Sequence, residues 1–548
     1  MRAQDPDEST SLSTVEKPPR LESTRRDDSM DDQAMDAETL GEPTGVQSGR
    51  LKPDTLLSGL LFLLGATVLQ RSIGLVRSGI FFRLMDPAEL GLWDVSYGFL
   101  LVAAPLITLG IPGTLPRYFD RFRRRGTLPK LLLQIVGGLT AVAAIAAAVI
   151  IQFRAEFGQW LFGRTDQAGL VIGVGLSLLA RAWFSVAVKF FVAMRLQRMA
   201  SLMYFCHSLL FAVIGFLSLA TISSSAVCVL FAHSFAMVVT LPLVAYWLLK
   251  TWRTIPVAES DEVQPTEWRS IGLFSISLCL SGVLTNVFTL VDRYMIVHYS
   301  GLGTTASLAM VGQYFAARII PMLMISVATG FAFQMLPHLT QDWEEGRREI
   351  VGRKIDFTLR SVALFSFAFA SLFLVIAPWI FSQVFADKFD TGLTVLGITL
   401  TSGILFCMFS TAKLHLWCFE KAWVAGLLCF GATVVNAIAN IVLLPRYGLQ
   451  GTATAHCLGV LSLLLGVYAV SGWLGMKFKV ATFVLTAVPF TLFFGSGFAF
   501  TALLMSMLLV LTTNLIFDAA EKRQMMQAAR EMVLRLPGFN GRSYLPTP

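Results

Sequence analysis

Charged residues are scarce in this sequence. Only 14% of its 548 residues are Asp, Glu, Lys or Arg, whereas 55% are hydrophobic and the mean hydropathy is +0.66. A soluble protein of this size would carry roughly 25% charged residues, so a soluble globular fold is excluded. Apolar runs of about 18–25 residues recur along most of the chain, which is the pattern of membrane-spanning helices.

Several motifs that carry chemistry are also missing. The sequence contains no phosphate-binding glycine-rich loop, no serine nucleophile motif and no zinc motif, so we expect neither ATP hydrolysis nor covalent catalysis. The seven cysteines contain no CxxC pair and lie in or beside apolar runs, which predicts small buried hydrophobes instead of disulfides or metal ligands. We therefore expect a protein that is not an enzyme, with no catalytic residues, no metal, no cofactor and no nucleic-acid partner.

The apolar runs predict an all-α polytopic membrane protein with about fourteen transmembrane helices. The expected spans are approximately 56–82, 95–115, 131–152, 169–192, 201–220, 226–249, 270–296, 306–335, 359–381, 392–412, 422–444, 452–475, 480–495 and 498–517. The alternating loops are asymmetric, because one set carries 26 Lys and Arg residues and the other carries 6. The positive-inside rule then places both termini in the cytoplasm. A single long span across 480–517 is the alternative, but it would leave the basic C-terminus outside.

The two ends of the chain differ from its middle. Residues 1–52 hold 7 basic and 12 acidic residues and few aromatic ones, so we expect residues 1–54 to form a disordered acidic cytoplasmic tail. This tail lacks the pattern of a signal peptide. Residues 518–548 are expected to form an amphipathic cytoplasmic tail whose helix lies on the inner leaflet, and a solvated tail helix is the alternative.

An internal repeat is visible. The segment that begins GLVRSGIFF resembles the one that begins TLVDRYMIV, so that Arg77 corresponds to Asp292; further on, His233 corresponds to His456. Two homologous halves of six spans each would produce similarity at an offset of a little over 200 residues. The equivalent spans have the same expected orientation, which indicates parallel repeats.

The repeat predicts the domain organisation. We expect two six-helix bundles joined by a cytoplasmic linker and followed by two extra transmembrane helices. The expected boundaries are 55–250 for the first bundle, 251–269 for the linker, 270–475 for the second bundle and 476–517 for the extra helices.

Four basic residues lie well inside the expected spans: Arg71, Arg77, Arg181 and Arg318. The one clear acid is Asp292, so about three positive charges are left over before Arg293 near the outer end is counted. A lone Arg at bilayer depth costs at least about 2.5–3.5 kcal/mol, and buried charges pair with each other or face water or a charged ligand. The surplus predicts a cationic cavity that binds a polyanion, with Asp292 as the candidate for coupling to a cation.

These residues also have purely structural interpretations. Arg71 and Arg77 are six positions apart, about 240° around a helix, so we expect only one of them to contact ligand and favour Arg77. Arg318 could donate to carbonyls freed at a proline kink, and Arg181 could hold helices together. Arg293 could extend to the outer interface.

Three segments resemble the polysaccharide flippases of the multidrug/oligosaccharidyl-lipid/polysaccharide exporter superfamily. They are RSIGLVRSGIFFRLMDPAELGLW in the first span and loop, VDRYMIVHYSG with VGQYFAARI in the seventh and eighth, and NAIANIVLLPRYGLQGTATAH between the eleventh and twelfth. The resemblance implies transport of lipid-linked sugars across the bacterial inner membrane. The two extra spans after residue 475 resemble fourteen-span peptidoglycan lipid flippases, which leaves the glycan open.

We therefore expect a multi-pass inner-membrane flippase for oligosaccharide linked to undecaprenyl pyrophosphate, in surface or exopolysaccharide biosynthesis, working by alternating access. Its partners would be membrane lipid and a glycan polymerase or chain-length regulator, and we expect a monomer. Two alternatives stay open. One is a cation-coupled multidrug exporter of the same fold, although the sign of the intramembrane charge opposes it. The other is a membrane glycan polymerase or glycosyltransferase, although no acidic residues pair at a large outside loop.

Overall fold

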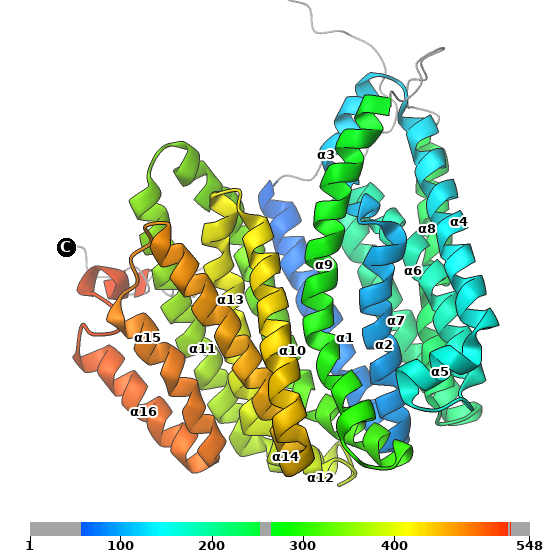
Figure 1. Ribbon diagram of the computed structural model, residues 1–548. Helices are drawn as coiled ribbons and strands as arrows, with labels where there is room; N and C mark the ends of the chain where they lie inside the picture. Colours follow the sequence, from blue (N-terminus) through cyan, green and yellow to red (C-terminus); the bar gives the residue numbers. More distant parts are fainter. Residues whose placement is uncertain (1–55, 253–264, 524–525, 528–548) are drawn as a thin grey trace, which may run out of the picture. The chain divides into compact units, whose positions relative to one another are not determined.

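The computed structural model describes residues 56–252, 265–523 and 526–527. Their secondary structure is helical throughout (Figure 1). The helices are α1 Leu56–Leu84, α2 Pro87–Thr108, α3 Ile111–Arg124, α4 Leu128–Gln152, α5 Arg154–Phe162, α6 Ala168–Ala193, α7 Gln197–Thr221, α8 Ala226–Trp252, α9 Pro265–Tyr299, α10 Thr304–Glu344, α11 Arg348–Gln383, α12 Asp390–Thr394, α13 Leu396–Cys418, α14 Ala422–Trp473, α15 Val480–Ala487, the 3₁₀ helix η1 Val488–Phe494 and α16 Ser496–Thr512. The expected tail 1–54 and most of the expected linker and C-terminal tail lie outside the described residues.

Ten of the described helices are long and apolar enough to cross a membrane, which confirms a multi-pass membrane protein. Each of the fourteen expected spans overlaps a helix, although the span count and the sidedness stay predictions. The helix α14 contains two of these spans, because its 52 residues are interrupted at Gly448, whose φ of 55° and ψ of −130° are not helical. An unbroken helix of that length would extend for about 78 Å, more than twice the bilayer core.

The expected span 95–115 is wrong at both ends. Pro87 starts α2 eight residues earlier, and the helix stops at Thr108, where Leu109 and Gly110 take positive φ values of 49° and 70°. A glycine adopts this conformation without the steric penalty of a side chain. The hydroxyl of Ser275 on α9 donates to the carbonyl of Leu109, which holds the break against α9.

The helices α2 and α10 cross at two glycines. A Cβ on Gly91 would clash with the carbonyl oxygen of Leu308, and a Cβ on Gly312 would clash with that of Pro87. The two glycines are 221 positions apart, and so are Pro87 and Leu308, so the contact is reciprocal, as across a two-fold axis. This geometry agrees with the parallel repeat that the sequence predicts, although the boundaries of the two bundles stay a prediction.

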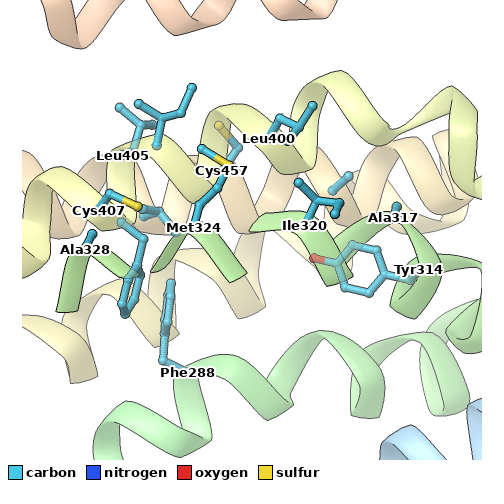
Figure 2. Packing of buried hydrophobic residues seen from close by; sticks show 14 of the residues in the cluster. Phe288, Tyr314, Ala317, Ile320, Met324, Ala328, Leu400, Leu405, Cys407 and Cys457 are labelled. Atoms are coloured by element: carbon cyan, nitrogen blue, oxygen red, sulfur yellow. The ribbon is translucent and has the colours of Figure 1, made fainter. Parts of the chain in front are cut away.

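Behind this crossing, α9, α10, α13 and α14 form a continuous apolar core (Figure 2). Phe288, Met324, Leu405 and Cys457 all contribute to it and are 7% exposed or less. All seven cysteines are free, and five of them are buried.

An ion pair inside the protein joins three helices. The guanidinium of Arg293 on α9 donates to both carboxylate oxygens of Asp94 on α2, at 2.6 and 3.0 Å, and to the carbonyl of Thr289 at 2.6 Å. Arg318 on α10 approaches the same carboxylate to 3.9 Å. Asp94 and Arg293 are each 1% exposed, so the prediction that Arg293 extends to the outer interface is wrong.

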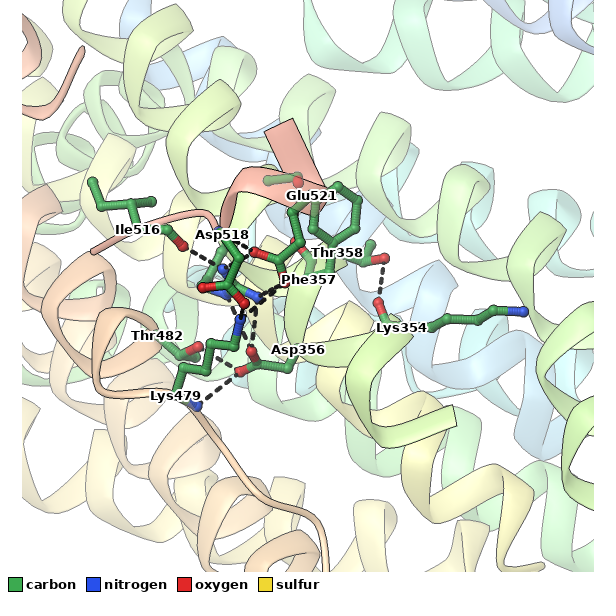
Figure 3. Close-up of polar contacts among 11 residues, drawn as sticks. Lys354, Asp356, Phe357, Thr358, Lys479, Thr482, Ile516, Asp518 and Glu521 are labelled. Carbon is green, nitrogen blue, oxygen red and sulfur yellow. Dashed lines mark hydrogen bonds and ion pairs between the residues drawn. The ribbon is translucent and has the colours of Figure 1, made fainter. Parts of the chain in front are cut away.

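The C-terminal helices form a hairpin beside α11 (Figure 1). The chain turns at Gly495, whose φ is 94°, between the arm formed by α15 with η1 and the arm formed by α16. Lys479, before the first arm, lies 2.5 Å from Asp518 and 3.1 Å from Glu521, after the second arm (Figure 3). The start of the first arm and the end of the second arm therefore lie at the same end of the hairpin. This arrangement favours two spans across 480–517 over one.

The base of this hairpin is held by Arg360 on α11, which is fully buried. Its guanidinium donates to Asp356 at 3.1 Å, to Glu521 at 2.7 Å and to the carbonyl of Ile516. Burial alone would raise the pKa of Glu521, but hydrogen bonds from Arg360, the Asp518 backbone and Lys479 outweigh it and lower the pKa to about 2. The ionised carboxylate therefore stabilises the hairpin base.

The Asp94–Arg293 pair can be tested with a double-mutant cycle. Asp94→Asn should destabilise the protein by about 3–5 kcal/mol, because it leaves a buried guanidinium without its carboxylate. The double variant Asp94→Asn/Arg293→Gln should lose clearly less than the sum of the single losses. Thermal unfolding in detergent measures all four proteins, and strictly additive losses would contradict the coupling.

The hairpin base predicts a pH dependence. Because the folded pKa of Glu521 lies below its usual value near 4.5, its stabilising effect should be complete above pH 4.5 and fall away as pH drops toward 2. The gap in thermal stability between the wild type and Glu521→Gln should therefore shrink across this window. A gap that stays constant from pH 6 to pH 3 would show that the ionised carboxylate contributes nothing.

Candidate functional site

A cavity of about 710 Å³ lies among α1, α2, α3, α6, α7, α8, α9 and α10. The Lys and Arg residues that line it are Arg71 and Arg77 on α1, and Arg181 and Lys189 on α6. Within the part of the chain that the structure describes, no Asp or Glu lines it. The cavity thus has the positive sign that the sequence predicts.

The two innermost arginines lie against aromatic rings. The Cζ atom of Arg77 is 4.3 Å from the ring centre of Phe211, and that of Arg181 is 5.8 Å from the ring centre of Tyr97. Among the described residues, neither guanidinium has a carboxylate partner. Cation–π contact orients a guanidinium but leaves its N–H groups free to donate to a ligand.

Arg71 and Arg77 both line the cavity, and the expectation that Arg77 is the one to contact ligand stays a prediction. The cavity borders eight helices, and α1 presents a broad face to it, from Gln70 to Phe81. The two arginines therefore both reach the cavity, although they lie about 240° apart around α1.

Arg318 lies elsewhere. It is 6% exposed and is absent from the cavity lining, and its Cζ atom is 5.0 Å from the ring centre of Tyr314. Its nearest acid is Asp94, and its Nη1 has no hydrogen-bond partner among the described residues. Of the four arginines proposed from the sequence, the structure brings together Arg71, Arg77 and Arg181.

Asp292 also lies outside the cavity lining, and it is fully buried. Asn436 donates to one carboxylate oxygen at 2.7 Å, the Tyr314 hydroxyl donates to the other at 3.2 Å, and Nδ1 of His456 lies 2.8 Å from that second oxygen. The charge of Asp292 is thus compensated by side chains from α10 and α14.

The charges inside the membrane helices can now be balanced. Once Asp94 and Arg293 join the set expected from the sequence, that set holds five arginines and two aspartates. Asp94, Asp292, Arg293 and Arg318 form a neutral group. The remaining three positive charges are those of the cavity arginines.

Sequence reasoning missed several of these residues. Asp94 precedes the expected span 95–115, and nothing local reveals a partner 199 positions away. Lys189 lies near the end of the expected span 169–192 and is not among the four basic residues singled out, but α6 carries it along the cavity. His207 gave no signal in the sequence, although its ring lines the cavity beside that of His233.

Segments far apart in sequence meet near the cavity. Next to Phe81 in the lining, Phe82 packs on Phe385 with a centroid distance of 4.4 Å, and the Lys388 ammonium lies 3.4 Å from Asp86. These segments are predicted to be extracytoplasmic.

The fold is similar to solved transporters. A structure described as the lipid II flippase MurJ in an inward closed conformation aligns with a TM-score of 0.63 at 11% identity, covering 86% of this chain and 100% of that one. An inward-facing multidrug resistance MATE family transporter of the MOP superfamily aligns with a TM-score of 0.60 at 13% identity, covering 78% and 98%. At such low identity these similarities show the fold alone.

A third structure is a MOP superfamily transporter from Pyrococcus furiosus, for which a reversed polarity of the binding pocket suggests a different function. It aligns with a TM-score of 0.54 at 14% identity, covering 76% of this chain and 94% of that one. No curated protein sequence matches the chain significantly.

The family comparison is more specific than the fold. The family described as polysaccharide biosynthesis protein matches residues 56–343, which is more than half of the 548 residues. This match includes every cavity arginine and the whole of α1 to α9. The chain therefore belongs to the polysaccharide biosynthesis protein family.

Proposed function

We propose that this protein is a flippase that moves an oligosaccharide linked to a polyprenyl pyrophosphate across the inner membrane. One observation carries the proposal: the cavity presents Arg71, Arg77, Arg181 and Lys189 with no acid in its described lining. A cation-lined cavity inside a membrane protein needs a polyanion to offset its charge. Family membership supports a role in polysaccharide biosynthesis.

The pyrophosphate fits the chemistry of the site. Arginine side chains bind phosphate oxygens through paired N–H donors, and a pyrophosphate offers several such oxygens. The head group and first sugars would occupy the cavity while the prenyl chain stays in lipid. Alternating access would then separate Lys388 from Asp86 and release the head group on that side.

Asp292 stays our proposed coupling residue. A proton or metal cation that reached its carboxylate would compete with the His456 contact at 2.8 Å. Such a competition would link ion binding to the packing of α9 against α14, which are in direct contact.

The rival function is a cation-coupled multidrug exporter, which shares the fold. An organic cation would need acids in the cavity, and the described lining contains none. A glycan polymerase or glycosyltransferase would need catalytic acids, and both Asp94 and Asp292 are engaged by protein side chains. Transport of an anionic lipid is therefore the better account.

The proposal predicts the effect of removing cavity charge. Arg77→Ala and Arg181→Ala should each lower translocation of a fluorescent polyprenyl-diphosphate sugar by about tenfold or more, since each loses a charge-assisted contact worth about 1.5–3 kcal/mol. Purified protein in liposomes gives the rate, with quenching of outer-leaflet probe as the measurement.

Arg446→Ala is the matched control, because Arg446 is exposed and absent from the cavity lining. It should translocate the probe at the wild-type rate. Wild-type rates in both cavity variants would refute the proposal. Export of a cationic dye that depends on Asp292, with no lipid translocation, would favour the multidrug exporter instead.

A further inference from the structure

His233 on α8 is a buried side chain with no partner. It is 4% exposed and lines the cavity, and neither of its ring nitrogens has a hydrogen-bond partner among the described residues. The Nε2 atom of His207, on α7, also lacks a hydrogen-bond partner among the described residues. A buried polar atom that lacks a hydrogen bond costs about 1–3 kcal/mol, so this arrangement requires a compensating contact.

The histidine lies between the two innermost arginines. Its ring centre is 4.9 Å from that of Phe211, which contacts Arg77, and 5.6 Å from that of Tyr97, which contacts Arg181. One cluster of rings thus carries both guanidiniums with His233 at its centre.

The ionisable side chains described around His233 include no carboxylate that could accept a hydrogen bond from its ring. The ionisable side chains around it are Arg77 on α1, Tyr97 on α2, Arg181 on α6 and His207 on α7. None of these is an acid. The imidazole N–H therefore has no anionic acceptor among these side chains, and a phosphate oxygen that enters the cavity is the strongest acceptor that the arginines would attract.

The internal repeat gives an independent argument. His456 occupies the position equivalent to His233, and its Nδ1 lies 2.8 Å from Asp292. In the first half of the chain, Arg77 corresponds to Asp292, so the protein supplies no carboxylate to His233. One histidine has an anionic partner from the protein, and the other faces the cavity that collects anions.

We propose that His233 is a ligand-binding residue that donates a hydrogen bond to a phosphate oxygen of the transported lipid, with His207 beside it. The inference rests on the proposed function and adds a neutral donor to the arginine site. The resulting subsite consists of Arg77, Arg181, His207 and His233, and it is matched to a diphosphate because two arginines and an imidazole can engage both phosphoryl groups at once.

The test uses the full chain in nanodiscs and farnesyl diphosphate as probe, with farnesyl monophosphate for comparison. His233→Phe keeps the ring that packs against Phe211 but removes the donor, and should weaken diphosphate binding about tenfold without lowering the unfolding temperature. His233→Gln retains an N–H donor and should stay within about threefold of the wild type. Arg446→Ala should bind as the wild type does.

Each outcome decides something different. If Arg77→Ala loses binding but His233→Phe does not, the histidine inference is overturned while the proposed function stands. Equal losses in His233→Phe and His233→Gln, together with lower unfolding temperatures, indicate a structural role and also overturn it. A wild-type protein that does not bind farnesyl diphosphate contradicts the proposed function itself.

A measurement on the unaltered protein guards against a variant that fails to fold. Solid-state NMR on ¹⁵N-histidine-labelled wild type should show dipolar coupling between an imidazole nitrogen and the ³¹P nuclei of bound farnesyl diphosphate. The absence of that coupling in a sample with saturated ligand would overturn the inference.

Discussion

The cost of placing charge inside a membrane governs this structure. Each ionised group at bilayer depth needs a partner, water or a ligand, and the protein meets this requirement in two separate ways. Asp94, Asp292, Arg293 and Arg318 compensate one another in a neutral group that joins α2, α9 and α10. The cavity arginines have no such carboxylate partner within the described part of the chain, and the helices place them together around one hollow.

This separation explains why the acids do not neutralise the cavity. The carboxylate of Asp94 is held by both ends of the Arg293 fork, and Asp292 accepts from Asn436 and Tyr314. Their lone pairs are used within the protein core, so a distant arginine gains little from them. The positive field of the cavity is therefore a consequence of how the neutral group is packed.

Much of the fold could be predicted from the sequence, because long apolar runs have few structural outcomes in lipid. The expected pairs of spans on either side of Gly448 and Gly495 are present as helices. The start of α2 at Pro87 was missed because the segment before residue 95 is only partly apolar, and the break at Leu109 depends on a contact with α9.

The candidate site was less accessible to prediction. An arginine in an apolar run signals a need for compensation, and this signal found Arg71, Arg77 and Arg181. The same signal could not separate these three residues from Arg318. Arg318 differs from them because it lies near the carboxylate of Asp94, and this contact exists only in the folded protein. The arrangement of His233 between Phe211 and Tyr97 likewise exists only once α2, α7 and α8 have packed.

The central claim is that the uncompensated arginines hold a pyrophosphate. A cryo-EM map of the full chain in nanodiscs with undecaprenyl pyrophosphate tests it most directly. The account predicts two adjacent phosphate densities within hydrogen-bonding distance of the Arg77 and Arg181 guanidiniums. A map of the occupied protein in which the phosphates lie outside the cavity, with both arginines unchanged, would contradict it.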